Sequence, residues 1–279
     1  MKLMPEQEWV KDIEELKKNN AKSTKVKLKN QVICAVNSLI PGKKFGILFS
    51  GGVDSALIAL LCQKAGADFV CFCVGLTDSP DLAWAREVAE KYGFKLKIRV
   101  IDKQEIEPLF RRTKKMLSHV DTLSIGVGSV LAAGIEIGKK MGISDFFTGL
   151  GSEEIFAGYH FHEEADDVNA ECWKRLKSMW RRDLKRDCAV ALALDVKLLT
   201  PFLDKSIIQA AMGIDSEYKI DDSDKKIILR RIAEDIGLDK KFAWRPKKAA
   251  QYGSWFDKML AKLARTKGFN TKQGYIDSL

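Results

Sequence analysis

A turn built on two adjacent glycines, Ser50-Gly51-Gly52, places the strongest constraint on how this chain folds. The short apolar run Phe45 to Phe49 precedes it and has the composition of an interior strand of a parallel sheet. Apolar residues at helical spacing follow between Ala56 and Leu61. The turn therefore joins the carboxyl end of a strand to the amino end of a helix. Bare backbone N–H groups and the helix dipole favour a phosphate or pyrophosphate there.

Strand and helix patterns alternate after this turn. Further strands are expected at 69–74, 95–101 and 145–148, and further helices at 79–92, 105–117 and 128–141. Ser79-Pro80-Asp81 is a typical start for the first of these helices, and Gly93 a typical end. The order predicts a doubly wound parallel α/β sheet with ligands beyond the carboxyl ends of its strands. Beyond Gly151 the chain is expected to be largely helical.

Glycine-bearing turns follow three of the expected strands. They are Ser50-Gly51-Gly52, Val74-Gly75 and Thr148-Gly149-Leu150-Gly151. If they converge, they outline one nucleotide site. Two helices, 6–19 and 25–39, are expected before the sheet. We therefore divide the chain into a helical lead, residues 1–42, packed on a core domain, residues 43–279.

Composition narrows the class of protein. The chain has 279 residues, of which 46% are hydrophobic and 30% charged. We find no apolar run near the roughly 18 residues that span a bilayer, and the Lys- and Glu-rich start does not resemble a secretory signal, which predicts a cytoplasmic protein away from membranes. Six cysteines without a C-x-x-C pair predict buried free thiols.

The net charge of +9 favours polyanionic partners. Much of the excess lies in the segment Glu171 to Asp187, where two tryptophans and two leucines form one helix face opposite Lys and Arg side chains. This segment is either a solvated basic face or a surface for RNA or an anionic substrate.

The six residues Ser50 to Ser55 resemble the PP-loop, S-G-G-x-D-S, of the N-type ATP pyrophosphatases, which cleave ATP to AMP and pyrophosphate. They do not form a Walker A loop, which has four residues between its glycines and then a lysine. Four further segments look like blocks of the asparagine synthetase family, in the family's order: CFCVGLTDSPDLAWAREVAEKYG, TGLGSEEIFAGYHFH, LLTPFLDKSIIQAA and WRPKKAAQYGSW. The resemblance spans Lys43 to Trp255. It implies a sheet of the adenine nucleotide α-hydrolase type with a helical C-terminal part.

The resemblance also implies a site for ATP and Mg²⁺. The residues that would bind the ATP phosphates are Ser50, Gly51, Gly52, Asp54 and Ser55. Adenosine would lie against Phe49, Val74 and Gly75, with Thr148 and Gly149 at the same site. Asp54 and Glu153, the latter standing where the family usually has Asp, would hold Mg²⁺, and Lys247 would neutralise the pyrophosphate. Residues 201–204 are expected to form a structural turn and helix start.

Several substitutions distinguish this chain from the family blocks. Leu150 replaces a Glu associated with the substrate and the adenylated intermediate, and Leu199 replaces an Arg. Ser124 and Val127 replace an Arg and a Thr, whereas Asp183 and Arg186 match a family D-x-x-R. Leu150, Asp183 and Arg186 are therefore the candidate substrate residues. The loss of charged groups predicts a carboxylate substrate other than plain aspartate.

The predicted activity is that of an AMP-forming carbon–nitrogen ligase: ATP adenylates a small-molecule carboxylate, and ammonia or an amine then displaces AMP. Glutamine-dependent members begin with a catalytic cysteine at position 2, where this chain has Lys2, so we expect free ammonia or a separate glutaminase subunit. Two alternatives remain. The first is a tRNA-modifying PP-loop enzyme that transfers sulfur or an amine, which the lack of C-x-x-C pairs disfavours. The second is a non-catalytic nucleotide-binding subunit. The acyl acceptor, the nitrogen donor and homo-oligomer formation stay open.

Overall fold

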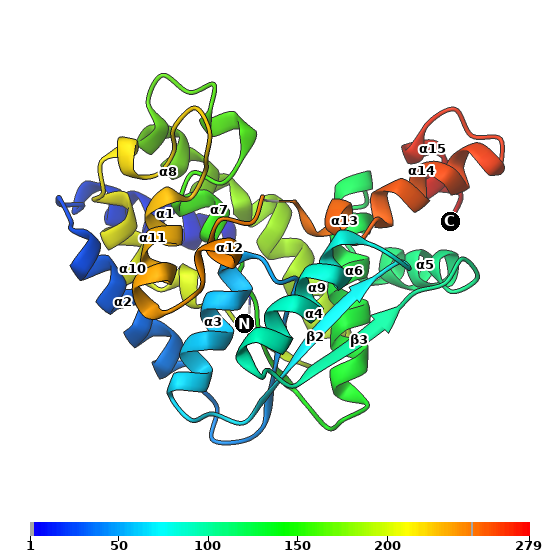
Figure 1. The fold of residues 1–279 in the computed structure, drawn as a ribbon. Helices are drawn as coiled ribbons and strands as arrows, with labels where there is room; N and C mark the ends of the chain where they lie inside the picture. The colour runs from blue at the N-terminus through cyan, green and yellow to red at the C-terminus, as the bar shows by residue number, and fades with distance from the viewer. Residues whose placement is uncertain (1–2, 247) are drawn as a thin grey trace.

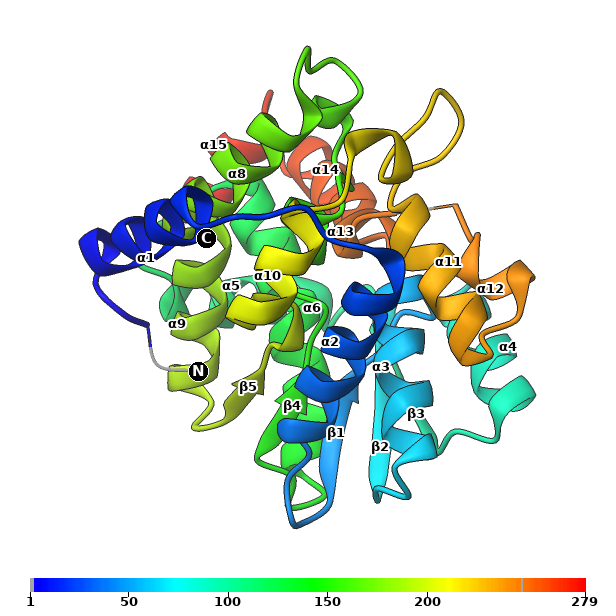
Figure 2. The same ribbon diagram turned by 90° about the vertical axis from the view of Figure 1, so that its left-hand side faces the viewer.

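Five parallel strands form the central sheet of the protein, which the computed structural model describes over residues 3–246 and 248–279 (Figures 1 and 2). The strands are β1 (Phe45–Leu48), β2 (Phe69–Gly75), β3 (Leu96–Val100), β4 (Asp145–Phe147) and β5 (Lys197–Leu199). Their order is β3-β2-β1-β4-β5, and every neighbouring pair is parallel. The strand order reverses at β1, which confirms the doubly wound α/β fold.

Both faces of the sheet are buried. Alternate side chains of β2 point to opposite faces, so that Cys71 and Cys73 join one hydrophobic cluster while Phe72 and Val74 join the other. Helices that contribute apolar side chains to the first cluster are α1 (Glu6–Lys18), α2 (Lys25–Ser38), α3 (Val53–Lys64), α4 (Pro80–Tyr92), α7 (Ser152–Ile155), α8 (Val168–Met179), α10 (Lys205–Met212), α11 (Ile227–Ile236) and α12 (Lys240–Ala243). Those of the second are α5 (Ile106–Met116), α6 (Thr122–Lys139), α9 (Lys185–Ala193), α14 (Phe256–Thr266) and α15 (Lys272–Ser278).

Most of the predicted elements are confirmed, with three differences. Strand β5 was not expected, because it is as short as β4 and lacks the glycine-bearing turn that follows β4. Helix α6 begins at Thr122 rather than 128, since Asp121 caps it by accepting a hydrogen bond from the Ser124 N–H at 2.6 Å. Ser79 does precede α4, but its hydroxyl makes no cap bond within the described part of the chain.

Shorter elements complete the C-terminal half: η1 (His160–His162), η3 (Pro201–Leu203), η4 (Ser216–Tyr218) and α13 (Ala250–Gly253). The expected turn and helix start at 201–204 is confirmed, because Asp204 caps α10 by accepting the Ser206 N–H at 2.8 Å. The expected burial of all six thiols is wrong for one of them. Cys34 is exposed, and the other five are buried and free.

Helix α6 is the one described helix long and apolar enough to cross a membrane, with a mean hydropathy of 1.2 over 18 residues. The hydropathy of this helix is therefore closer to that of a membrane span than we expected from the sequence. However, 61% of this helix is buried inside the protein, against β1, β2 and α5. Burial of this kind is typical of a core helix.

The basic segment 171–187 packs against the N-terminal helix rather than standing alone. It comprises α8, a π-helical turn η2 (Trp180–Leu184) and the start of α9. The Lys177 ammonium lies 2.6 Å from a carboxylate oxygen of Glu14, and the Arg181 guanidinium lies 2.5 Å from one of Glu6. Acidic residues of α1 thus meet two of its cations, and the segment is not a wholly solvated basic face.

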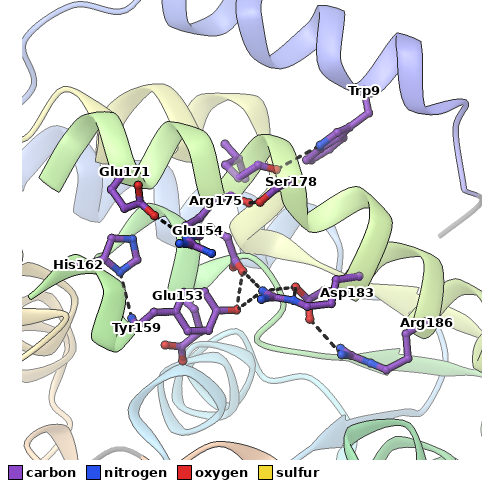
Figure 3. A network of polar contacts seen from close by, with 12 residues as sticks. Trp9, Glu153, Glu154, Tyr159, His162, Glu171, Arg175, Ser178, Asp183 and Arg186 are labelled. Atoms are coloured by element: carbon purple, nitrogen blue, oxygen red, sulfur yellow. Dashed lines mark hydrogen bonds and ion pairs between the residues drawn. The ribbon is translucent and has the colours of Figure 1, made fainter. Parts of the chain in front are cut away.

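Trp9 anchors α1 to this segment (Figure 3). Its side chain is 8% exposed, and its Nε1 donates to the carbonyl oxygens of Leu176 and Lys177 at 3.2 Å each. The lead of the chain is therefore held to the core by both apolar burial and hydrogen bonds.

We predict that Trp9→Ala lowers the free energy of unfolding by about 3 kcal/mol, because it opens a cavity and removes both hydrogen bonds. The matched control is Leu192→Ala, whose side chain is 83% exposed and whose loss should change stability by less than about 0.5 kcal/mol. Urea unfolding measures both. Equal effects of the two substitutions would show that α1 is not docked as described.

Candidate active site

The loop Ser50 to Ser55 connects β1 to α3 and has a fixed shape. Gly51 has a φ of +71°, and a Cβ atom added there would lie 2.9 Å from the backbone oxygen of Trp84 in α4, so only glycine fits. The Gly52 N–H donates to Ser50 Oγ at 3.3 Å, and Ser55 Oγ donates to the Gly52 carbonyl at 3.2 Å. The predicted strand–turn–helix is thus present, with Ser50 in the turn and Ser55 in the first turn of α3.

Arg245 ties this loop to α4. Its guanidinium donates to the Ser50 carbonyl oxygen and, at 2.5 Å, to Asp81 Oδ1, and both charged side chains are 5% exposed. Burial raises the pKa of Asp81, and Arg245 lowers it only in part. Arg230 in turn donates to the carbonyl oxygens of Ala243 and Arg245 at 2.6 and 3.0 Å. Two sequence blocks far apart in the chain are therefore joined by a buried ion pair.

Asp54 and Glu153 meet at the carboxyl ends of the adjacent strands β1 and β4. Asp54 lies in the first turn of α3 and Glu153 in α7. Lys226 lies between them: its Nζ donates to Asp54 Oδ2 at 2.8 Å, to Ser152 Oγ at 3.0 Å and to Glu153 Oε1. Burial lowers the pKa of Lys226, but the two carboxylates outweigh burial and raise it overall. The site is thus built on two partly exposed carboxylates joined by one buried ammonium.

The acid pair fits a magnesium ion that also binds phosphates. Asp54 Oδ1 is buried and has no hydrogen-bond partner among residues 3–246 and 248–279. A carboxylate oxygen without a donor is suited to a cation, and Mg²⁺ prefers one or two protein carboxylates together with phosphate oxygens.

Three cavities open around Ser50. The first, of about 180 Å³, is mainly apolar, and the predicted residues Phe49, Val74 and Thr148 line it. Gly75 does not line it, because a Cβ there would meet Ser79 Oγ at 2.2 Å, which places this glycine against α4. The contact of Gly75 with adenosine therefore stays a prediction, outside the described lining of this cavity.

The second cavity, of about 280 Å³, brings together most of the predicted site. Its lining includes, from the sequence predictions, Ser50, Gly52, Asp54, Ser55, Val127, Thr148, Gly149, Leu150, Glu153, Asp183 and Arg186. Leu199 and Ser124 are not among the described lining residues. Leu199 is 2% exposed in the hydrophobic core, and Ser124 is buried at the start of α6. The residues at these two positions thus lie outside the described lining of this cavity.

The third cavity, of about 50 Å³, is lined by charged groups around the loop. Its cationic lining residues are Lys226, Arg230, Arg245 and Lys248, and its acids are Asp54 and Glu153. This excess of positive charge beside a turn with two serines favours an anion. Lys247, predicted to act here, lies outside the described residues.

A polar network forms one wall of the second cavity (Figure 3). Arg186 is 5% exposed and donates to Asp183 at 3.0 Å and to Asp187 at 2.7 Å. Arg182 lies 2.6 Å from Asp183 and donates to the Tyr159 hydroxyl at 3.1 Å. Both arginines that line this wall are therefore already paired with carboxylates.

Tyr159 connects this wall to Glu154, whose side chain is 1% exposed (Figure 3). The Tyr159 hydroxyl donates to Glu154 Oε1 at 2.6 Å. Burial, and then the nearby Asp183 carboxylate, raise the pKa of Glu154 to about 7. The cavity thus contains a carboxyl group that titrates near neutrality.

Sequence reasoning missed Lys226, Arg245, Arg182 and Tyr159. Lys226 belongs to the run D-K-K-I-I-L-R-R, which has the composition of a solvated charged segment, so no local signal could have found it. Arg245 stands in a quoted family block, two positions before the lysine that was singled out. A larger cavity of about 580 Å³, lined by Leu76, Ile101, Trp255 and three lysines among others, contains none of the predicted residues.

Comparisons with known proteins identify the family of this chain. The family model for asparagine synthase matches residues 27–168 and 162–278. A putative glutamine-hydrolyzing asparagine synthetase of Methanocaldococcus jannaschii is 32% identical over 88% of this chain and 52% of that protein, and asparagine synthetase 1 of Lotus japonicus is 30% identical over 80% and 42%. The chain thus spans about half the length of these relatives.

Among solved structures, an NMN synthetase from Francisella tularensis has a TM-score of 0.44 and 14% sequence identity, covering 89% of this chain and 90% of that one. This likeness is too slight to support a conclusion about activity.

The free energy of unfolding of the wild type should fall as the pH rises, because Glu154 loses a proton. We predict that Glu154→Gln makes this fall smaller. The carboxyl titrates near 4.5 when unfolded and near 7 in the native protein. Between these values the native state binds the extra proton, so the free energy of unfolding falls as the pH rises, by about 3 kcal/mol in all, and the loss is complete above pH 7. Gln still accepts the bond from Tyr159 but has no proton to lose.

Urea unfolding at pH 4.5 and 8.5 measures this difference. Glu217→Gln, at an exposed position, is the control and should follow the wild type. A Glu154→Gln variant with the pH dependence of the wild type would show that Glu154 does not titrate in this range.

Proposed function

The chain belongs to the asparagine synthase family, and we propose on that premise that it activates a carboxylate with ATP and transfers ammonia or an amine to it. The observation that carries the proposal is the convergence of the Ser50 to Ser55 loop, the acid pair Asp54 and Glu153, and a cationic cavity at one edge of the sheet. Because the relatives are longer, their whole activity is carried over here only as a proposal.

In the proposed reaction the ATP phosphates lie on the loop, and adenosine enters the apolar cavity beside Phe49 and Val74. A carboxylate oxygen of the substrate attacks the α-phosphorus, and the bond between the α- and β-phosphates breaks. Pyrophosphate leaves against Gly52 and the cations of the small cavity, which act by positioning and charge stabilisation. A nitrogen nucleophile then attacks the acyl carbon and displaces AMP.

Asp54 and Glu153 are the residues proposed to hold Mg²⁺. Bound there, Mg²⁺ would neutralise charge on the phosphates and on the departing pyrophosphate. We assign Lys247 a similar role from its place in the family block W-R-P-K-K, where its ammonium would stabilise the leaving group.

The second cavity favours a carboxylate substrate other than plain aspartate. Leu150 and Val127 line it where the family has polar residues, and its arginines are occupied by Asp183 and Asp187. An additional substrate carboxylate would find no unpaired arginine among the described lining residues. A bulkier or less charged acid fits this wall better, with nitrogen from ammonia or a glutaminase partner.

The five buried free thiols support a reducing compartment such as the cytoplasm.

We predict that the wild type, given Mg²⁺, ATP, ammonium and a panel of carboxylates, releases pyrophosphate with an acid other than aspartate. Asp54→Ala should lower this rate by about 100-fold or more, because the phosphate charge loses its carboxylate-held cation. A coupled pyrophosphate assay measures both. Formation of ADP and phosphate instead of AMP and pyrophosphate would contradict the proposed reaction. Rapid synthesis of asparagine from aspartate would contradict the proposed substrate class.

Lys247→Met should lower kcat for pyrophosphate release by about 100-fold with little change in ATP affinity, because the ammonium acts on charge that develops in the transition state. Lys248→Met is the comparison variant: it removes the same charge one residue later, from a side chain that lines the small cavity, and should lower kcat less. A greater loss with Lys248→Met would move the role to that residue, which lines both charged cavities.

A further inference from the structure

The Lys226 ammonium is buried and fully hydrogen-bonded. Its side chain is 1% exposed, and Nζ donates to Asp54 Oδ2, Ser152 Oγ and Glu153 Oε1. An ammonium group has three donors, and here each has an acceptor. The reaction described above counts this ammonium among the cations of the small cavity but gives no reason for its bonds to the two carboxylates.

The backbone around Lys226 is built to hold it there. Lys226 has a φ of +57°, an uncommon conformation for a residue with a side chain, and stands immediately before α11. A Cβ atom added to Gly158 would lie 2.5 Å from Lys226 Cε and 2.0 Å from Glu153 Oε2. The pocket is thus closed around the ammonium and the glutamate together, which fixes where the charge lies.

The Lys226 ammonium lies where a divalent cation bound to both Asp54 and Glu153 would lie. An ion that binds both Asp54 and Glu153 must either displace the ammonium or lie within a few ångströms of it. Two cations at that separation repel strongly away from bulk water. A nucleotide triphosphate removes this penalty, because its own negative charges surround the ion and can also accept a bond from the displaced ammonium.

We propose that Lys226 is a positioning residue that serves as a built-in counter-ion: it holds Asp54 and Glu153 together in the absence of a metal and makes binding of a divalent cation depend on nucleotide. The inference rests on the proposed function, which assigns the two carboxylates to Mg²⁺. Its consequence is an order of binding in which the metal enters with ATP rather than before it.

Binding of Mn²⁺ alone, followed by electron paramagnetic resonance, tests this dependence. Without nucleotide, the wild type should bind Mn²⁺ weakly, and Lys226→Met should bind it at least about tenfold more tightly, since the competing charge is gone. Lys226→Arg keeps the charge and should stay weak. The matched control is Lys225→Met, which removes a neighbouring ammonium that pairs with Glu163 at 2.6 Å and should leave Mn²⁺ binding unchanged.

Thermal unfolding gives a second readout. Mg²⁺ alone should leave the melting temperature of the wild type unchanged, whereas Mg²⁺ with a non-cleavable ATP analogue should raise it. Lys226→Met should melt about 5 °C or more below the wild type, because two partly buried carboxylates lose the buried cation that pairs with both. Mg²⁺ alone should recover most of that loss.

The inference is overturned if the wild type itself is stabilised by Mg²⁺ alone, a result that needs no variant to fold, or if Lys226→Met gains no affinity for Mn²⁺. Asp54→Asn separates this failure from failure of the proposed function. If Asp54→Asn abolishes binding of Mn²⁺ with the analogue, the carboxylates are the metal site and only the role of Lys226 is wrong. If it has no effect, the proposed nucleotide site itself is wrong.

Discussion

The pairing of β1 with β4 is the constraint on which the candidate site depends. Gly46 and Ile47 of β1 lie opposite Phe146 and Phe147 of β4, so the turns that follow the two strands leave the sheet side by side. One turn leads into α3 and carries Asp54, and the other leads into α7 and carries Glu153. The strand order reverses at β1, the place where doubly wound sheets bind ligands.

The site also needs positive charge around the Ser50 to Ser55 loop. Residues far from this loop in sequence supply it. Arg230 lies in α11, Lys226 immediately before this helix and Arg245 shortly after α12. Helices α11 and α12 both pack against α3 (Figure 2). The three side chains contribute positive charge to a turn that carries little of its own. Arg245 also fixes the loop through the Ser50 carbonyl and anchors it to Asp81. Folding of the C-terminal half therefore completes the site rather than simply enclosing it.

The parts of the fold that could be predicted are those with a local cause. Strands β1 and β2 are buried on both faces and appear as continuous apolar runs between turn residues. The glycines and the aspartate of the Ser50 to Ser55 loop have their conformational and chemical roles within six residues. Strand β5 was not predicted, because it is as short as β4 but lacks the glycine-bearing turn that follows β4. Its place in the sheet depends on pairing with β4.

The parts that could not be predicted depend on tertiary partners. Lys226 differs from any surface lysine only through Asp54, Ser152 and Glu153, which are 73 or more residues away. Leu199 was given a place near the substrate because it aligns with a family arginine, yet its side chain belongs to the core. A sequence comparison alone does not show whether such a substitution removes a contact with the substrate or stands at a position that packs in the core.

Transfer of oxygen-18 tests the central claim most directly. A substrate labelled in its carboxylate oxygens, incubated with the protein, Mg²⁺, ATP and ammonium, passes one labelled oxygen to the phosphate of AMP if that carboxylate attacks the α-phosphorus. We expect labelled AMP and unlabelled pyrophosphate in equal amounts. Product formation with AMP free of label, or with the label in inorganic phosphate, would contradict adenylation at this site.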